Sequence, residues 1–459
     1  MMKKIILSDR GCLFADEILK YTDWEIQLLI VDDFGHHKEK YNANNRIKQI
    51  IKYSELMDWD GPFVLDQNDV ESYLHLFNVG DYGARRTNDN FHYAHFQFYH
   101  SIAFWNNYLD SHNIDFCIVT NTLHGFENDY ILEEVCRKRK IQCFNLFYHF
   151  IDKIGLFEIN SGSLCKLKAS DDSQIDISKV ADYRSSFDYD VLRDIPFPRI
   201  ARFVYKIWGA KGIRYAAFLL KREQNIHYNI CTFSKYKFSL KRIKEVQKYV
   251  RSLYREVDCT KKYLIYFLHF EPEAVVTANS QVIDSQIVQI RMISEQLPSG
   301  WILYVKEHPD TYAKINSWEM EYFIPEMPTF YSEYFYDKIS RFKNVVLVDY
   351  KLSAKDLITN CEGIATIAGT VMTEAIVQNK PVLMFAENRH VYSYNNDIFH
   401  IHSSEDIQRA IKKIRNGMTP DYSNIPTLVN EFLANSDECG KKRIIMSIDD
   451  LESNRVKNE

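Results

Sequence analysis

From Tyr263 onward the sequence alternates between short apolar runs and stretches of helical periodicity, and this alternation most constrains the fold. Strands spaced in this way are typical of a parallel sheet, because parallel neighbours need a crossover connection, usually a helix. The pattern therefore predicts a doubly wound parallel sheet. Its predicted strands are Tyr263–Phe270, Trp301–Val305, Asn344–Val348, Gly363–Ile367 and Pro381–Phe385, and its predicted helices include Ile283–Leu297, Ala354–Thr359 and Val371–Gln378.

The N-terminal part shows the same alternation less completely. Apolar runs at Lys4–Ser8 and Ile26–Val31 flank a helical stretch, Ala15–Lys20, as in a βαβ unit. The pattern returns with Phe116–Thr120, a helix over about 130–140, and Ile141–Leu146. The sequence thus predicts a second unit of the same class, and the fold class is α/β.

The chain has 459 residues, which is too long for one ordinary hydrophobic core. We expect two Rossmann-like domains facing a central cleft, with a helical connector between them. The predicted segments are an N-terminal Rossmann-like domain over 1–160, the connector over 161–258, a C-terminal Rossmann-like domain over 259–426 and a C-terminal helical tail over 427–459.

Composition and charge exclude several classes of protein. Hydrophobic residues make up 46% and charged residues 26%, which is ordinary for a folded chain. The net charge of -5 gives no overall attraction to nucleic acid, so none is expected as a partner. Nine cysteines lie scattered without paired C-x-x-C spacing, and no apolar run is long enough for a signal peptide or a bilayer span. A cytoplasmic protein is therefore expected.

One local segment departs from the overall charge. Residues 199–222 contain seven Lys and Arg with no acid, interleaved with aromatic and aliphatic residues. A basic amphipathic helix of this kind can lie on an anionic membrane, which would place the protein at the inner face of the membrane. The alternative is a helix that packs its apolar side on the protein and leaves its charges in solvent.

The turn between the strand Gly363–Ile367 and the following helix is the first candidate site. Backbone N–H groups at a helix start can bind phosphate oxygens, and Gly369 permits close approach by a ligand. The Thr370 and Thr373 hydroxyls add donors, while Glu374 is suited to a ribose or base; Ala368 completes the turn. An ordinary capped helix would look similar.

Polar residues also follow two other strands of this predicted sheet. Lys306, Glu307, His308 and Pro309 come directly after one strand, and a histidine there can donate a hydrogen bond or a positive charge to a departing phosphate. His269, Glu271 and Glu273 end the first strand and would open onto the same crevice, where a sugar or acceptor could be held. Taken alone, each of these histidines could instead be a loop residue.

These motifs, in this order, resemble those of bacterial capsular polysaccharide synthesis glycosyltransferases. The resemblance rests on Leu268–Ala274, Tyr304–Pro309, Thr366–Ala375 and Lys380–Leu383, and more faintly on Asn121–Leu146. The group includes Kdo transferases, and its His-Pro element is similar to that of bacterial sialyltransferases.

The resemblance implies a GT-B fold and a nucleotide-sugar-dependent, metal-independent glycosyltransferase with no cofactor. The N-terminal domain would bind a glycan or lipid-linked glycan acceptor, and the C-terminal domain a nucleotide-sugar donor. It favours a CMP-activated acidic sugar such as Kdo or a sialic-acid-like sugar. By the same resemblance, His308 would bind the donor phosphate, and Thr370 and Thr373 would line its pocket.

The general base remains open at this stage. Related sialyltransferases carry it in an acidic pair followed closely by glycine, and Asp32-Asp33-Phe34-Gly35 is the nearest match, with Phe34 intervening. Asp9, Glu127 and Asp129 are further candidates in the N-terminal half. Two other functions also remain open: a CDP-polyol phosphotransferase of the teichoic-acid type, and a non-catalytic scaffold subunit of a polysaccharide assembly complex.

Overall fold

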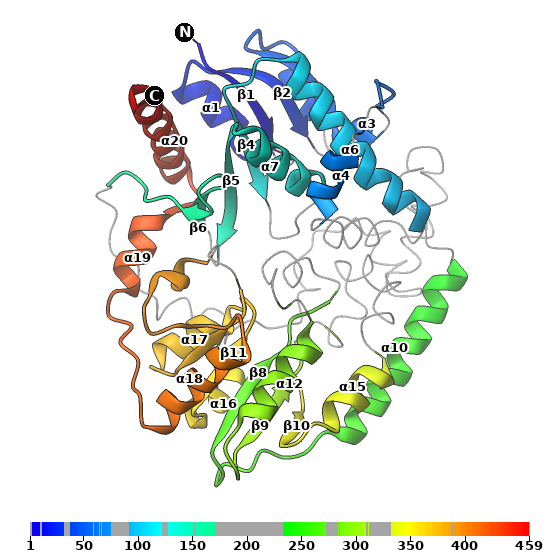
Figure 1. Cartoon of the computed structure of the whole chain (residues 1–459), viewed down its shortest axis with the longest axis vertical. Coiled ribbons are helices and arrows are strands. Elements are labelled where there is room, and N and C mark those ends of the chain that lie inside the picture. The colour runs from blue at the N-terminus through cyan, green and yellow to red at the C-terminus, as the bar shows by residue number, and fades with distance from the viewer. Residues whose placement is uncertain are drawn as a thin grey trace, which may run out of the picture.

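The chain forms two largely parallel β-sheets flanked by helices, in a mixed α/β architecture (Figure 1). The computed structural model describes residues 2–9, 12–31, 37–57, 59–63, 65, 67–74, 91–121, 127–149, 153–169, 233–271, 283, 285–308, 311, 332–386 and 390–458. The predicted α/β class with parallel sheets is confirmed.

The first sheet has eight strands among the described residues, in the order β14-β6-β5-β4-β1-β2-β3, with β7 beside β6. The strands from β5 to β3 are parallel, whereas β6 pairs antiparallel with β5, β7 and β14. Their bounds are β1 Lys4–Ser8, β2 Glu25–Val31, β3 Ile47–Lys52, β4 Phe116–Asn121, β5 Gln142–His149, β6 Lys153–Glu158, β7 Ser163–Leu164 and β14 Leu433–Asn435.

Helices lie around this sheet, as expected for parallel strands covered on both faces. Consecutive residues of β1 and β2 are buried, and Ile6 and Leu28 join one core cluster while Ile5 and Leu29 join another. The helices are α1 Ala15–Tyr21, α2 His37–Tyr41, α3 Tyr53–Met57, α4 Gln67–Tyr73, α6 Phe91–Ser111 and α7 Glu127–Arg139.

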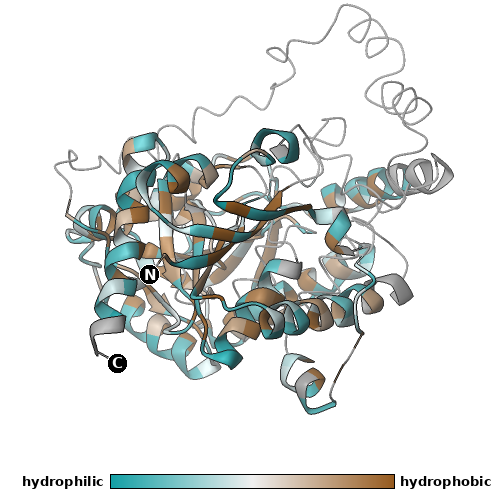
Figure 2. Ribbon diagram, turned by 90° about the horizontal axis from the view of Figure 1, so that it is seen from above, coloured by the Kyte–Doolittle hydropathy of each residue, from teal (hydrophilic) through white to brown (hydrophobic). Residues whose placement is uncertain are grey.

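The second sheet has six strands among the described residues, all parallel, in the order β10-β9-β8-β11-β12-β13. All five residues of β8, at its centre, are buried. Figure 2 shows the apolar residues, in brown, concentrated in the central strands. The strands are β8 Tyr263–Phe267, β9 Ile302–Lys306, β10 Val345–Val348, β11 Gly363–Thr366, β12 Val382–Met384 and β13 Phe399–His400.

The helices of the second half connect these strands or flank them. In chain order they are α10 Phe233–Leu253, α12 Gln286–Gln296, α15 Glu333–Ser340, α16 Ala354–Asn360, α17 Val371–Val377, the 3-10 helix η4 Val391–Tyr394, α18 Ser404–Arg415 and α19 Ile425–Phe432. The serines before α15, α16 and α18 accept a backbone N–H of the first turn, which explains why each of these helices begins where it does.

The strands and helices predicted in the two alternating regions are present, with ends that differ by a few residues. The connector and the tail differ more from expectation. The predicted connector begins with β7, a strand of the first sheet, and the predicted helical tail contains β14, another strand of that sheet. Both strands are two or three residues long, which is too short for a periodic signal. The division into four segments stays a prediction.

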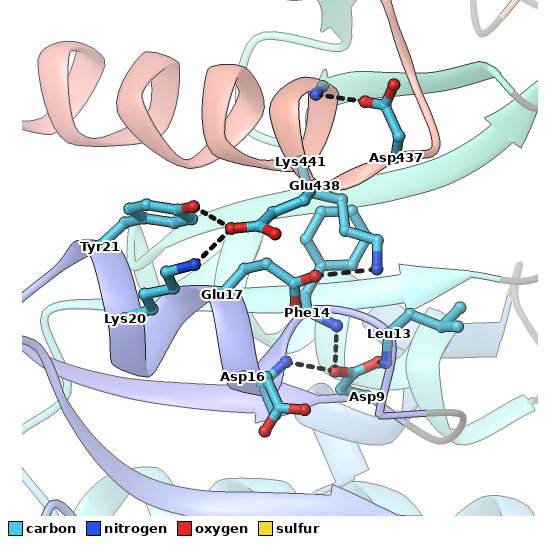
Figure 3. Close-up of polar contacts among 12 residues, drawn as sticks. Asp9, Leu13, Phe14, Asp16, Glu17, Lys20, Tyr21, Asp437, Glu438 and Lys441 are labelled. Carbon is cyan, nitrogen blue, oxygen red and sulfur yellow. Dashed lines mark hydrogen bonds and ion pairs between the residues drawn. The ribbon is translucent and has the colours of Figure 1, made fainter.

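The C-terminal segment returns to the N-terminal half. Strand β14 pairs with β6, and α20 (Glu438–Asn458) buries Ile444, Ile445 and Ile448 in the core cluster that contains Phe14 of the β1–α1 connection. At the edge of this contact, Lys441 pairs with Glu17 at 3.0 Å, and Glu438 accepts hydrogen bonds from Lys20 and Tyr21 (Figure 3). The two ends of the chain therefore build one hydrophobic core together.

Candidate functional site

Three neighbouring strands of the second sheet end at one edge. Because β9, β8 and β11 are adjacent and parallel, the residues that follow them must come together at their carboxyl ends. His269 and Glu271 follow β8, Glu307 and His308 follow β9, and the turn over 367–370 follows β11. The predicted site residues of the C-terminal half are thus drawn from three segments of one sheet edge.

His269 lies at the centre of this edge. Its side chain is buried, and Nε2 lies 3.2 Å from Oγ1 of Thr366 and accepts the backbone N–H of Ala368 at 3.2 Å. A backbone N–H can only donate, so Nε2 is the acceptor and the ring proton belongs on Nδ1. Burial, and after it the charge of His308, lowers the pKa of His269 to about 3. The ring is therefore neutral at physiological pH.

Gln286, the first residue of α12, holds the backbone of His269 on both sides. Its Oε1 accepts the N–H of His269 at 2.8 Å, and its Nε2 donates to the carbonyl of His269 at 3.2 Å and to Oε2 of Glu271 at 2.8 Å. Gln286 is 2% exposed. Gln286 therefore supports the site from beneath, together with Thr366.

The turn after β11 packs closely against this histidine. A Cβ placed on Gly369 would lie 3.0 Å from Oγ1 of Thr366 and 3.2 Å from Cγ1 of Val371, so a larger residue would require these side chains to shift, and it would contact His269. Ala368, Gly369 and Thr370 are half-buried, and the N–H of Met372 donates to the carbonyl of Gly369 at 3.0 Å. Because α17 has only seven residues, its dipole is a weak attraction for an anion without side-chain help.

His308 follows β9, which neighbours β8 on the side away from β11. It is half-buried, its ring centroid is 6.4 Å from that of Phe270, and its charge is close enough to lower the pKa of His269. The N–H of Thr311 donates to its carbonyl at 3.1 Å, which fixes the chain as it leaves the sheet. The strand order therefore places the segments that carry His308 and Gly369, sixty-one positions apart, on either side of the end of β8, which His269 follows.

Lys306 and Glu307 are nearly inaccessible, at 4% and 1% exposure. Burial lowers the pKa of Lys306 to about 8, against the opposing effects of Glu307, Glu374 and Asp349. Burial raises the pKa of Glu307 to about 8, and one of its oxygens accepts a hydrogen bond from the Tyr336 hydroxyl. Successive residues of an extended chain point to opposite faces, so Glu307 faces α15 and Lys306 faces the opposite side.

Two residues predicted to line the donor pocket lie on α17. The hydroxyl of Thr373 is buried and lies 2.8 Å from that of Tyr392 in η4, inside the protein. Glu374 is half-buried, and its charge acts on Lys306. Sequence patterns gave no signal for Tyr336 or Tyr392, because both come from other segments and meet the site only through tertiary packing.

In the N-terminal half, the described acidic candidates are engaged in local structure. The carboxylate of Asp9 points at the start of α1 (Figure 3) and accepts the backbone N–H groups of Leu13, Phe14 and Ala15 at 2.7–2.9 Å. It also accepts the hydroxyl of Thr120 at 3.1 Å. Burial raises the pKa of Asp9, and these four donors oppose that effect. Asp9 therefore caps the start of α1 from six positions upstream.

Asp129 is buried on α7 and accepts the hydroxyl of Ser8 at 2.8 Å. Glu127 is the first residue of α7. The remaining predicted residues lie outside the part of the chain that the structure describes: Asp32, Asp33, Glu273, Pro309 and the basic segment 199–222. The placement of the general base therefore stays a prediction.

Comparison with protein-family models gives no match for this chain, and comparison with curated proteins gives none either. Solved structures with a related arrangement include KpsC, a beta Kdo 2,7 transferase of Thermosulfurimonas dismutans, with 12% identity, coverage of 76% of this chain and 89% of that chain, and a TM-score of 0.30.

A UDP-GlcNAc 2-epimerase of Methanocaldococcus jannaschii is 14% identical, with 98% and 99% of the two chains covered and a TM-score of 0.28. CalG4, the calicheamicin glycosyltransferase, is 11% identical, with 97% and 95% covered and a TM-score of 0.25. At these identities and TM-scores, the likenesses establish neither a family nor an activity for this chain.

Proposed function

We propose that this chain is a GT-B glycosyltransferase that holds the phosphate of a nucleotide-sugar donor at the carboxyl edge of β8, β9 and β11. The observation that carries the proposal is the strand order β9-β8-β11, in which His308 and the Gly369 turn follow the two strands that flank β8, and the buried His269 follows β8 itself. His308 is half-buried and follows a rigid strand, which suits a group that must meet a ligand in a fixed geometry.

In this proposal His308 donates a hydrogen bond, or a full positive charge when protonated, to the phosphate that leaves the sugar. Negative charge develops on that phosphate in the transition state, so a fixed donor lowers the barrier more than it strengthens ground-state binding. Buried Lys306 adds a positive charge beneath the same edge, with Glu374 nearby to balance it. His269 stays neutral and holds the turn in place.

A carboxylate of the N-terminal half would take the proton of the acceptor hydroxyl. Asp9 is poorly suited to this, because its two oxygens already accept four hydrogen bonds and it is fully buried. Asp32 and Asp33 are the favoured pair, because Asp32-Asp33-Phe34-Gly35 is the nearest match to the acidic pair of related sialyltransferases. The motif resemblance of residues 304–309 and 366–375 favours a CMP-activated acidic sugar and a glycan or lipid-linked glycan acceptor.

Calorimetric titration with a panel of nucleotides tests the proposal. CMP and CMP-N-acetylneuraminic acid are expected to bind more tightly than UDP-N-acetylglucosamine and CDP-ribitol. The variant His308→Ala should lose most of this affinity, while His402→Ala, which removes an exposed histidine after β13, two strands beyond β11 in the sheet, serves as the matched control.

The other outcomes separate the remaining functions. Tighter binding of CDP-ribitol would replace the proposal with a CDP-polyol phosphotransferase. Preference for UDP-N-acetylglucosamine would remove the CMP-sugar assignment, and product analysis would then distinguish epimerisation from transfer. An absence of binding by every nucleotide would leave a non-catalytic subunit as the better description.

A further inference from the structure

Positive charge is concentrated in one stretch of the chain. Residues 199–251 contain fourteen Lys and Arg against two Glu, in a protein whose overall net charge is -5. The C-terminal part of this stretch forms α10, which lies beside α15 at the periphery of the molecule (Figure 1). A local charge of this size, opposite in sign to the whole, indicates an anionic partner for this region.

Helix α10 has two distinct faces. Its apolar side buries Ile243, Val246 and Val250, and its flank is tied to α15 by an ion pair from Arg242 to Glu333. Its outer side exposes four basic residues, Lys241, Lys244, Lys248 and Arg251. Spacings of three and four place these side chains in one row, which rises about 15 Å along the helix.

Among the described residues, three members of this row form no ion pair with an acidic side chain. Glu245 lies 3.9 Å from Lys241 and 3.4 Å from Arg242. Within the part of the chain that the structure describes, no carboxylate forms an ion pair with Lys244, Lys248 or Arg251. Exposed charges contribute little to the stability of the fold, so this row is available to an anionic partner.

We propose that the row Lys241, Lys244, Lys248 and Arg251 binds the surface of an anionic phospholipid membrane. A straight row of cations on a peripheral helix matches a flat array of lipid phosphates, whereas a pocket for a single small anion would need donors converging on one point. Along 241–253, the part of α10 whose side chains the structure describes, no large apolar side chain is exposed, so this part of the helix lies against headgroups without entering the hydrocarbon.

Among the described residues no helix is both long and apolar enough to cross a membrane. Contact through α10 is therefore peripheral and electrostatic, and it weakens as salt shortens the screening length to a few ångströms. It is also independent of the proposed transfer activity, because the row lies on α10 and not at the carboxyl edge of the second sheet.

Flotation of the full chain with lipid vesicles tests this. We expect binding to vesicles of equal parts phosphatidylglycerol and phosphatidylcholine at low salt, little binding to phosphatidylcholine alone, and release at 0.5 M sodium chloride. The variant Lys244→Glu/Lys248→Glu/Arg251→Glu should lose at least tenfold in vesicle affinity. A matched control reverses three exposed charges on α18, as Lys412→Glu/Lys413→Glu/Arg415→Glu.

The proposal is overturned if the α10 variant binds the anionic vesicles as well as the α18 control does, or if both lose affinity equally. It is also overturned if the wild-type protein fails to bind these vesicles. The same holds if α10 binds the soluble polyanion dextran sulfate but the protein does not bind the vesicles. Thermal unfolding of both variants verifies that they are folded. If the α10 charge-reversal variant does not fold, the neutral variant Lys244→Gln/Lys248→Gln/Arg251→Gln takes its place.

Discussion

The backbone N–H of Ala368 donates to Nε2 of His269 across 3.2 Å, and this bond ties the end of β8 to the turn that follows β11. It also determines the role of the histidine, because a ring nitrogen that accepts a backbone N–H cannot donate from the same atom. His269 therefore supports the turn, while His308 remains the half-buried imidazole suited to a ligand.

Replacing His269 tests that role. His269→Leu leaves the N–H of Ala368 without its acceptor, which should lower the free energy of unfolding by about 1–3 kcal/mol. His269→Gln offers an amide oxygen at a similar reach and should recover much of the loss. Equilibrium urea unfolding measures the stability of both variants. Equal losses of unfolding free energy would show that the acceptor for the Ala368 N–H does not determine the effect of replacing His269.

His308→Ala should abolish transfer without unfolding the protein. The side chain is half-buried at the end of β9, so its removal opens little cavity and should shift the melting temperature by no more than about 2 °C. Losing a charge-assisted hydrogen bond to phosphate should weaken nucleotide binding about 10- to 100-fold. Full activity in this variant would remove His308 from the mechanism.

Glu307 should make stability depend on pH. Its pKa is about 8 in the folded protein, above its ordinary value of 4.5, so the folded chain keeps a proton that the unfolded chain releases between these values. Stability due to this group is therefore full below pH 4.5 and falls as the pH rises toward 8.

Glu307→Gln stays neutral and can still accept the Tyr336 hydroxyl. It should exceed the wild type in unfolding free energy by on the order of 4 kcal/mol at pH 8, and the difference should vanish as the pH falls below 4.5. Urea unfolding of both proteins across this pH range measures the difference. A difference that does not change with pH would contradict the raised pKa of Glu307.

The alternating parts of the fold were predictable because their signals are local. Strands such as β8 and β9 are continuous apolar runs followed by helices of regular period, and the structure has them within a few residues of their predicted ends. Strands β7 and β14 were not predictable, because they have two and three residues and are formed by pairing with β6. Their positions depend on contacts far along the chain.

The same distinction holds at the candidate site. The carboxyl-end rule for parallel strands placed His269, His308 and Gly369 at one edge, because it follows from topology alone. It could not show that Thr373 is bonded to Tyr392, or that Glu307 faces Tyr336. Those relationships depend on how α17, η4 and α15 pack, for which single-sequence patterns carry no signal.

Asp9 should behave as a structural residue. Its carboxylate accepts three backbone N–H groups at the start of α1, which has no side-chain cap at Phe14, the residue directly before it. Asp9→Ala leaves these buried donors unsatisfied and should cost at least about 2 kcal/mol of unfolding free energy. Asp9→Asn keeps one acceptor oxygen and should cost less. A variant as stable as wild type would return Asp9 to the candidates for general base.

The contact of α20 with the N-terminal half should depend on apolar packing more than on its ion pairs. Ile445 is fully buried beside the β1–α1 region, so Ile445→Ala should lower the unfolding free energy by about 2–5 kcal/mol. Lys441→Ala breaks the pair with Glu17 at the rim and should cost less than about 1 kcal/mol. If the lysine variant were the less stable of the two in urea unfolding, electrostatics would be the main cause of docking. If Ile445→Ala is the less stable variant, as expected, α20 belongs to the hydrophobic core of the N-terminal half. Deleting 438–459 should then destabilise the strands near the N-terminus.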